Sequence, residues 1–187
     1  GQIISRILHM RGITFTALES NPTQVDFVRK LGSKIYYGDA TRLDLMRSAR
    51  VENAKLCVLT INNIETSIRV AQLLRRHYPQ IPIYARAHNR LHSYKLMDLG
   101  VQVLYRDTFY SSLKLARSIL EGLGMPPEES ERTVEMFREH DEKLLLRQHA
   151  IYQDEQALIE SALKSRAELQ SLFESDESER RNKTWSM

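Results

Sequence analysis

The sequence has a single cysteine, Cys57, and lacks an apolar run of the length that a transmembrane helix requires. One cysteine excludes an internal disulfide and is typical of a reducing compartment. Because Cys57 lies within the apolar run "KLCVLTI", we interpret it as a packed thiol rather than a reactive one. A helix needs about 20 apolar residues to cross a bilayer, and no signal peptide opens the chain. We therefore expect a soluble, cytosolic segment.

Charge of one sign is not concentrated anywhere in the chain. The 27 basic and 24 acidic residues are interspersed and give a net charge of +3. A surface that binds nucleic acid needs clustered lysine and arginine, so the sequence argues against nucleic acid as a partner.

Recognisable catalytic machinery is also missing. The six histidines show no convincing metal-ligand spacing, and we interpret His88 and His92, four residues apart, as a surface pair. No nucleophile motif is found. We predict no catalytic residue and no metal site, and hence a protein that is not an enzyme.

Short β-rich runs alternate with amphipathic helical patterns over residues 1–106. The pattern predicts strands at residues 13–19, 34–37, 55–61, 81–87 and 101–106. Intervening helices of about 10 to 15 residues indicate right-handed βαβ crossovers and a parallel sheet. The largely apolar run 55–61 should be a central strand covered on both faces. The predicted fold class is α/β, a doubly wound parallel-sheet Rossmann-like domain.

The chain begins like the end of a phosphate-binding loop. Gly1, followed by "QIISRIL", is typical of the last glycine of a G-x-G-x-x-G loop that opens its helix. Glu19 ends the next predicted strand, about where this fingerprint places an acidic residue. We expect the first strand and most of the glycine loop to lie upstream.

After Arg106 the pattern becomes almost wholly helical. Residues 107–146 predict a helical subdomain whose one clear break is at Met125-Pro126-Pro127, because proline suits the start of a helix. Residues 147–175 predict a C-terminal helix. Residues 176–187 lack periodicity and predict a frayed tail.

Polar and small residues follow the predicted strands, where open parallel sheets bind ligands. Glu19 could accept hydrogen bonds from ribose hydroxyls and would repel a 2′-phosphate, which favours NAD or AMP over NADP. Asp39, Ala40 and Thr41 follow the next strand, and small Ala40 would let an adenine lie against the backbone. Helix capping explains Asp39 and Thr41 equally well.

Further residues lie at or near the predicted crevice. The helix that begins at Gly1 would direct its backbone amides at a phosphate. Thr60 and Ile61 close the third strand and Asn62 follows in the loop, although ordinary turn chemistry also accounts for Thr60 and Asn62. Arg86 and Arg106 lie near strand ends, where a guanidinium group needs a partner. That partner is either an anionic ligand or a carboxylate, with Asp107, Asp98 and Glu19 as the candidate carboxylates.

Two long segments, "KIYYGDATRLDLM" and "IYARAHNRLHSYKLMDLGVQVLYRDTFYSSLKLARSIL", resemble the KTN/RCK nucleotide-binding regulatory domain of potassium transport systems. The combination of "YGDAT", "ARA" followed by a helix to "LG", "RDTF", and an "FRE" helix beyond "LGMPP" is more specific. It resembles the cytosolic C-terminal domain of the Kef glutathione-gated potassium efflux systems. The resemblance covers residues 1 to about 146.

This resemblance implies gating rather than catalysis. Kef systems are cation:proton antiporters whose cytosolic domain forms a homodimer, binds AMP or NAD(H), is inhibited by glutathione and is activated by glutathione adducts. The chain would then lie at the cytoplasmic face of the inner (plasma) membrane, in the same polypeptide as the membrane antiporter domain. Some relatives also have an ancillary oxidoreductase-like subunit.

The resemblance also implies site residues. The nucleotide contacts would be Gly1, Glu19, Asp39, Ala40, Thr41 and Thr60. The glutathione contacts would be Arg6, Arg106 and Asp141. Some relatives carry asparagine where this chain has Asp141, so this carboxylate either contacts the ammonium group of the ligand or alters glutathione binding. Phe109, Tyr110 and Phe137 are candidates for a side chain that a bulky adduct would displace.

Other functions compete with this interpretation. A Trk-type regulator of potassium uptake would respond to nucleotide alone, and the helical extension after Leu123 disfavours it. An NAD-dependent oxidoreductase would need an acid/base residue and a substrate domain, and neither is visible in the sequence. A third possibility is that the fold retains only a role in dimerisation.

Overall fold

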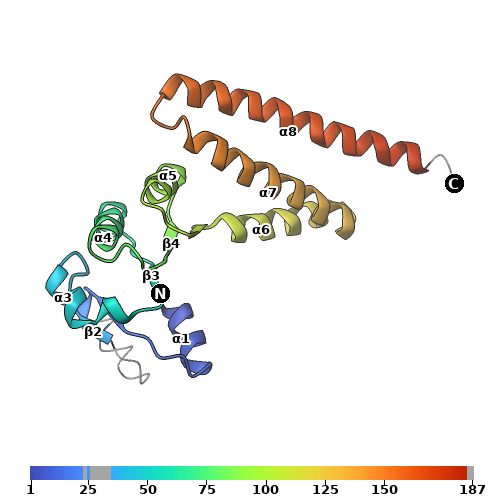
Figure 1. Ribbon diagram of the computed structural model, residues 1–187. Helices are drawn as coiled ribbons and strands as arrows, with labels where there is room; N and C mark the ends of the chain where they lie inside the picture. The colour runs from blue at the N-terminus through green and yellow to red at the C-terminus, as the bar shows by residue number, and fades with distance from the viewer. Residues whose placement is uncertain (23–24, 26–34, 185–187) are drawn as a thin grey trace. The chain divides into compact units, whose positions relative to one another are not determined.

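The computed structural model of the chain describes residues 1–22, 25 and 35–184. Its helices and strands, in chain order, are α1 (Gln2–Met10), β1 (Ala17–Glu19), β2 (Ile35–Tyr37), α3 (Leu43–Ser48), the 3-10 helix η1 (Val51–Asn53), β3 (Cys57–Leu59), α4 (Ile64–His77), β4 (Ile83–Ala87), α5 (Arg90–Asp98), β5 (Val103–Arg106), α6 (Phe109–Gly122), α7 (Pro127–His149) and α8 (Glu155–Thr184) (Figure 1). Most of the intervening helix expected between the strands at residues 13–19 and 34–37 lies outside the described residues.

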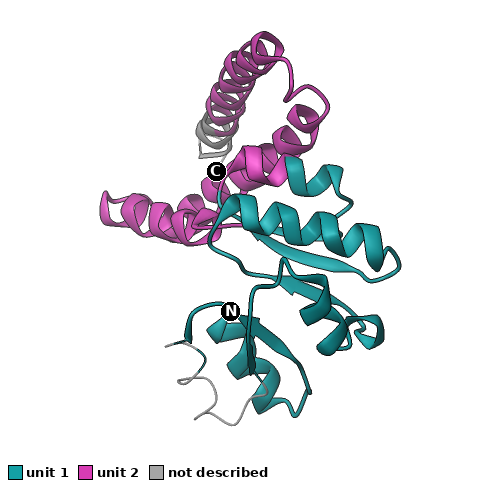
Figure 2. Cartoon of the chain, turned by 90° about the vertical axis from the view of Figure 1, so that its left-hand side faces the viewer, with its two compact units in different colours: residues 1–88, 95–105 teal, residues 89–94, 106–187 magenta. Residues whose placement is uncertain are grey.

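The chain forms two compact units (Figure 2). Unit 1 comprises residues 1–88 and 95–105, and unit 2 comprises residues 89–94 and 106–187. Helix α5 therefore begins in unit 2 and ends in unit 1. Unit 1 holds the strands up to Tyr105, and unit 2 is helical.

The strands of unit 1 form two sheets, one of β1-β2 and one of β3-β4-β5. β1 and β2 pair in parallel with Glu19 opposite Tyr37, and β3 and β4 pair in parallel with Cys57 opposite Ile83. The predicted α/β class is confirmed, but the sheet is divided where one continuous sheet was expected. The neighbours within each of the two sheets are compatible with the doubly wound strand order 3-2-1-4-5-6.

Helix α4 supplies much of the core of unit 1. It begins at Asn63, whose side chain accepts a hydrogen bond from the Thr66 backbone N–H at 2.8 Å and so caps the helix. Its apolar residues recur at helical spacing and pack against β3 and β4. The core contains Leu59, Val70, Ala71, Leu74, Tyr78, Ile81, Ile83, Ala85, Ala87 and Leu96. Packing of these residues between α4 and the sheet holds the carboxyl ends of β3 and β4 in place.

The strand β3 differs from its prediction. The apolar run 55–61 was expected to be covered on both faces, yet Val58 is 43% exposed while Leu59 is buried. Among the described strands β3 stands at the end of its sheet. An apolar run indicates a strand but does not reveal which neighbours will cover it, so the prediction of a central strand covered on both faces was wrong.

In unit 2, α7 begins as the sequence predicts, with Pro127 at its first turn followed by Glu128 and Glu129. A second break, over residues 150–154, was missed. There the Asp154 carboxylate accepts a hydrogen bond from the Ala157 backbone N–H at 3.0 Å and caps α8.

The far end of α8 is a further correction. The sequence predicted a frayed tail from residue 176, but α8 continues to Thr184. Residues 155–184 contain no glycine or proline, so no residue in this stretch breaks a helix.

In the described part of the chain, no helix combines the length and the apolar composition needed to cross a bilayer.

Candidate functional site

Glu19 is the last residue of β1, and Asp39 lies two residues after the end of the paired strand β2. Glu19 stands opposite Tyr37 in the parallel register, and its backbone carbonyl accepts a hydrogen bond from Gly38 N–H at 2.9 Å. The Glu19 carboxylate accepts a second hydrogen bond, from Asn21 N–H at 2.9 Å. The structure thus places the two predicted acidic residues on neighbouring strand ends in unit 1.

The segment from Asp39 to Thr41 forms a turn before α3 rather than the first turn of a helix. The Asp39 carboxylate accepts a hydrogen bond from Thr41 N–H at 2.9 Å, and Arg42 N–H donates to the Asp39 carbonyl at 3.0 Å. Helix α3 starts only at Leu43, with Arg42 as its N-cap, so Asp39 does not cap it. Ala40 packs against the core of unit 1.

Asp39 is held in its ionised form. The hydrogen bond from the Thr41 backbone N–H, followed by one from the Thr41 hydroxyl, lowers the pKa of Asp39 below its ordinary value. Arg69 and Arg42 contribute in the same direction. The turn therefore presents a negative charge next to small Ala40.

Gly1 approaches Thr60 closely. A Cβ placed on Gly1 would lie 3.1 Å from the Thr60 hydroxyl oxygen, which is tighter than an ordinary side-chain contact. Gly1 is the N-cap of α1, whose first turn contains no acidic residue. The positive end of this helix therefore lies beside the residue that follows β3.

Arg86 stabilises the loop that follows β3. Its guanidinium group donates to Asn62 Oδ1 at 2.6 Å and to the Thr60 carbonyl at 3.3 Å. His88 Nε2 lies 3.2 Å from the Ile61 carbonyl oxygen. The sequence had suggested an anionic ligand or a carboxylate as the partner of Arg86, whereas these two acceptors are a side-chain amide and a backbone carbonyl. Asn62 is thus occupied as a hydrogen-bond acceptor.

The second candidate cluster lies within unit 2, around Asp141 on α7. Asp141 is 8% exposed, and its two carboxylate oxygens form ion pairs with Arg90 and with Arg106. The Arg106 guanidinium carbon also lies 3.8 Å from the centroid of the Phe109 ring. Arg90 donates to Gln148 Oε1 at 3.0 Å. The structure therefore brings together Arg106 and Asp141.

Sequence reasoning missed Arg90. It occupies the first position of α5, where a cation is disfavoured by the helix dipole. An arginine at such a position signals a compensating carboxylate elsewhere in the fold, and that carboxylate is Asp141.

The other predicted effector residues are placed differently. Arg6 lies on α1 in unit 1, so the structure does not bring it together with Arg106 and Asp141 in one unit. Tyr110 donates from its hydroxyl to Glu142 Oε1 at 3.0 Å, and its ring contacts Phe109 edge to face. Phe137 is exposed on α7.

Among the described residues, no group of three or more histidine, cysteine, aspartate and glutamate side chains could hold a metal ion. The prediction of a surface histidine pair is wrong for His92, which is 1% exposed. Its place near the start of α5 buries it. Cys57 is a free, partly buried thiol whose pKa is raised by burial.

Two family models match successive parts of the chain. The TrkA-N domain matches residues 1–106, and the KefB C-terminal domain of the potassium efflux system matches residues 111–186.

Solved structures of a Kef C-terminal domain and of a TrkA-N domain are also similar to this chain. The C-terminal domain of Kef from Shewanella denitrificans, in an AMP-bound form, is 34% identical with a TM-score of 0.72, over 80% of this chain and 92% of that chain. The TrkA-N domain of the inner membrane protein ybaL from Escherichia coli is 28% identical with a TM-score of 0.56, over 66% and 88%.

The NAD(P)-binding domain of an exopolyphosphatase-related protein from Archaeoglobus fulgidus is 15% identical with a TM-score of 0.57, over 65% of this chain and 90% of that chain, and shows a shared fold alone. Together, the Rossmann-like strands, the helical extension and these matches show that the chain belongs to the Kef-type KTN/RCK regulatory domains of potassium efflux systems, which are ligand-binding domains of transporters and not enzymes.

Proposed function

We propose that this chain binds an adenine nucleotide at the strand ends of unit 1 and gates potassium efflux in response to glutathione and its adducts. The observation that carries the nucleotide proposal is the close approach of the Gly1 backbone to Thr60 at the start of α1. A Cβ at this position would crowd the Thr60 hydroxyl, whereas glycine leaves space at the positive end of a helix, where phosphate groups bind.

The other strand-end residues fit the rest of such a nucleotide. Glu19 would accept hydrogen bonds from the ribose, and Ala40 would lie against the adenine ring. Asp39 and Thr41 offer polar contacts beside it. The resident group is AMP or NAD(H), which share the adenosine part. The AMP-bound form of the Shewanella denitrificans relative supports this proposal.

The effector site is proposed around Arg106 and Asp141, with Arg6 as a further contact. Glutathione is a net anion at neutral pH, so guanidinium groups suit its carboxylates. An adduct with a bulky group on sulfur would displace Phe109, Tyr110 or Phe137. Because a ligand shifts an equilibrium only through its different affinities for two states, this displacement would favour the conducting state.

The proposal extends to the assembly. Family membership implies association with a membrane antiporter domain, which we place in the same polypeptide, with this chain at the cytoplasmic face of the membrane. We further propose a homodimer and, as in some relatives, an ancillary oxidoreductase-like subunit. Residues 1–106 would form the nucleotide-binding domain, and residues 107–146 the dimerisation and ligand-binding subdomain.

Calorimetric titration of the full-length natural polypeptide tests this function. AMP should bind saturably, and glutathione and a bulky S-substituted glutathione should then bind in the presence of AMP. Arg106→Ala should abolish binding of both thiol-derived ligands and leave AMP binding intact. Arg132→Ala is the matched control, because Arg132 is a surface arginine on α7 that pairs with Asp176.

The outcomes separate the competing functions. If Arg106→Ala loses glutathione binding and the control Arg132→Ala keeps it, the result supports glutathione gating. Saturable AMP binding without binding of either thiol-derived ligand would favour a regulator that responds to nucleotide alone, as in the Trk-type systems. Absence of AMP binding would overturn the nucleotide site and favour a fold retained for dimerisation.

A further inference from the structure

Asp141 binds two arginines at once within unit 2. Arg90 donates to Oδ1 and Arg106 donates to Oδ2, so each carboxylate oxygen has its own guanidinium partner. The side chains of Arg106 and Asp141 are 12% and 11% exposed, and that of Arg90 is 33% exposed. The cluster therefore combines two positive charges with one negative charge, largely away from solvent.

Both guanidinium groups are also held by groups other than Asp141. Arg90 donates to Gln148 Oε1, which at the same time accepts a hydrogen bond from the Tyr94 hydroxyl at 3.1 Å. Arg106 lies over the ring of Phe109. These contacts orient the two donor groups toward one point even without the carboxylate. A pair of oriented guanidinium groups of this kind is a recognition site for a carboxylate.

We propose that Asp141 is an internal competitor for the anionic effector: its carboxylate occupies the position between Arg90 and Arg106 that a ligand carboxylate takes on binding. This inference rests on the proposed effector site at Arg106 and defines how that site is regulated. Binding is then an exchange of one carboxylate for another on the same two arginines. The apparent affinity is lowered by the fraction of molecules in which Asp141 holds the arginines.

The exchange also connects ligand binding to the helices of unit 2. Asp141 lies on α7, whereas Arg90 begins α5 and Arg106 ends β5. When a ligand takes the guanidinium groups, α7 loses the ion pairs that join it to both of these elements. A ligand that replaces Asp141 therefore changes how firmly α7 is held, which gives the differential interaction that gating requires.

The test compares wild-type full-length polypeptide with Asp141→Asn by calorimetry, using glutathione as the probe and AMP throughout. The amide keeps the shape of the side chain and removes its negative charge. The expected result is at least about tenfold tighter glutathione binding in Asp141→Asn, since the internal anion no longer competes. Glu135→Gln, which removes a negative charge from the exposed Glu135–Arg138 pair on the same helix, should bind as the wild type does.

Equal or weaker glutathione binding in Asp141→Asn overturns the proposal, and weaker binding shows instead that Asp141 contacts the ligand directly. A second variant covers the case in which Asp141→Asn does not fold. Asp141→Ala should be stabilised against thermal unfolding by acetate, compared with chloride at equal ionic strength, and the wild type should not. The absence of this difference overturns the proposal. Loss of AMP binding in the wild type would instead count against the proposed nucleotide function.

Discussion

At the scale of single residues, Arg75 shows how one side chain stabilises several segments of unit 1. It lies in the last turn of α4, and its guanidinium group donates hydrogen bonds to backbone carbonyls on both sides of β4. The acceptors are the carbonyl oxygens of Leu99 (2.7 Å), Pro79 (3.1 Å), Ile81 (3.2 Å) and Gly100 (2.5 Å), and the side-chain oxygen of Gln102 (3.0 Å). Gln102 in turn accepts from Ile83 N–H at 2.6 Å.

We predict that Arg75→Lys lowers the free energy of unfolding by about 2–3 kcal/mol, because an ammonium group has fewer donors and no planar fork, and leaves the partly buried carbonyls of Leu99 and Ile81 less well satisfied. Urea denaturation followed by circular dichroism measures the change. Arg76→Lys, at an exposed neighbouring position, should stay within about 0.5 kcal/mol of the wild type. Equal effects of the two substitutions would show that the Arg75 hydrogen bonds contribute little.

Glu19 allows a prediction on nucleotide choice, if the proposed site is correct. The wild type should bind NAD more tightly than NADP, because the carboxylate repels a 2′-phosphate. Glu19→Gln should reduce this preference by about tenfold, which corresponds to roughly 1.4 kcal/mol of charge repulsion. Calorimetry with both nucleotides measures the ratio, and Glu52→Gln at an exposed site is the control. An unchanged ratio would remove Glu19 from the ribose site.

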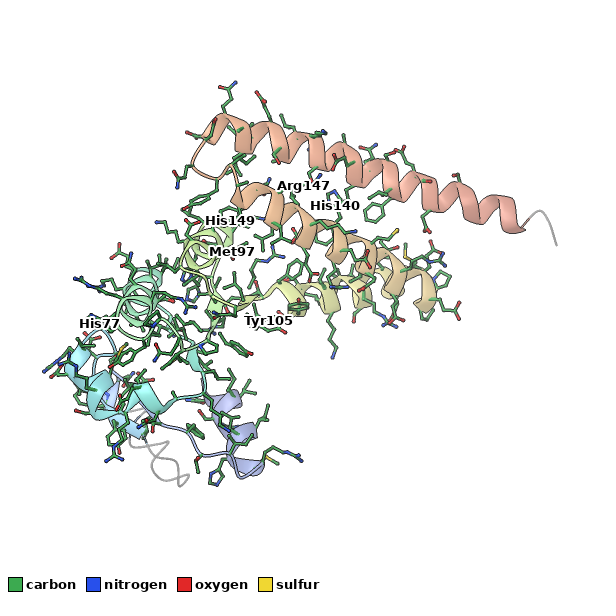
Figure 3. All side chains as sticks on the ribbon, in the orientation of Figure 1. His77, Met97, Tyr105, His140, Arg147 and His149 are labelled. Carbon is green, nitrogen blue, oxygen red and sulfur yellow. The ribbon has the colours of Figure 1, made fainter. Side chains whose placement is uncertain are left out.

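At the scale of secondary-structure elements, the contact between α7 and α8 is strongly polar. Glu168 on α8 accepts a hydrogen bond from Arg147 at 3.1 Å and lies 3.6 Å from His140 Nε2. His140 and Arg147 are labelled on α7 in Figure 3. Ser165, which is buried, lies 3.4 Å from the same histidine nitrogen. The polar seam, defined as His140, Arg147, Ser165 and Glu168, therefore contributes electrostatic as well as apolar stabilisation.

The polar seam predicts an acid-sensitive attachment of α8. Arg147, followed by His140 and Lys164, lowers the pKa of Glu168 from its ordinary value near 4.5. A carboxylate with a lowered pKa adds stability above its unfolded-state pKa, and this stability is lost as the pH falls through the folded-state pKa.

Glu168→Gln should therefore lower the thermal stability of α8 at pH 7 and reduce the further loss below pH 4.5. Circular dichroism melts of the wild type and the variant over this range measure both effects. Glu160→Gln on the same helix is the control. Identical acid profiles for the wild type and Glu168→Gln would contradict the prediction.

At the scale of the whole molecule, the exposed surface of unit 2 bears on the proposed homodimer. Leu115 and Ile119 on α6, and Leu123 at its C-cap, follow one another at helical spacing and are 61%, 52% and 81% exposed. An aligned stripe of large apolar side chains on a surface is typical of a protein–protein contact. This stripe supports α6 as part of the interface between two copies of the chain.

We predict that the double variant Leu115→Glu, Ile119→Glu weakens self-association by at least about tenfold, because charges replace apolar contacts in the core of an interface. Size-exclusion chromatography with light scattering measures the dissociation across a concentration series. Lys114→Glu, at a neighbouring exposed position outside the stripe, should have little effect. A double variant that remains as associated as the wild type would place the interface elsewhere.

Much of the fold was predictable because it depends on local patterns. Gly12, two residues after the end of α1, has a φ of +66°, which glycine adopts more readily than other residues. Pro127 begins α7, where the fixed φ of proline suits the first turn of a helix. The α/β class follows from the alternation of apolar periods and is confirmed. The break at residues 150–154 and the length of α8 were not predicted, because capping by Asp154 and helical continuity in a charged segment leave weak signals.

The sequence alone determined the fold class, the order of most elements and the family, because each depends on residues that are close together along the chain. Only the tertiary structure decided the partners of charged and polar groups. Asp141 is 35 residues from Arg106 and 51 from Arg90, and no local pattern indicates which carboxylate a guanidinium group will reach. Burial makes that pairing necessary, since an isolated charge away from water is strongly unfavourable, but the packing of α7 selects the partner.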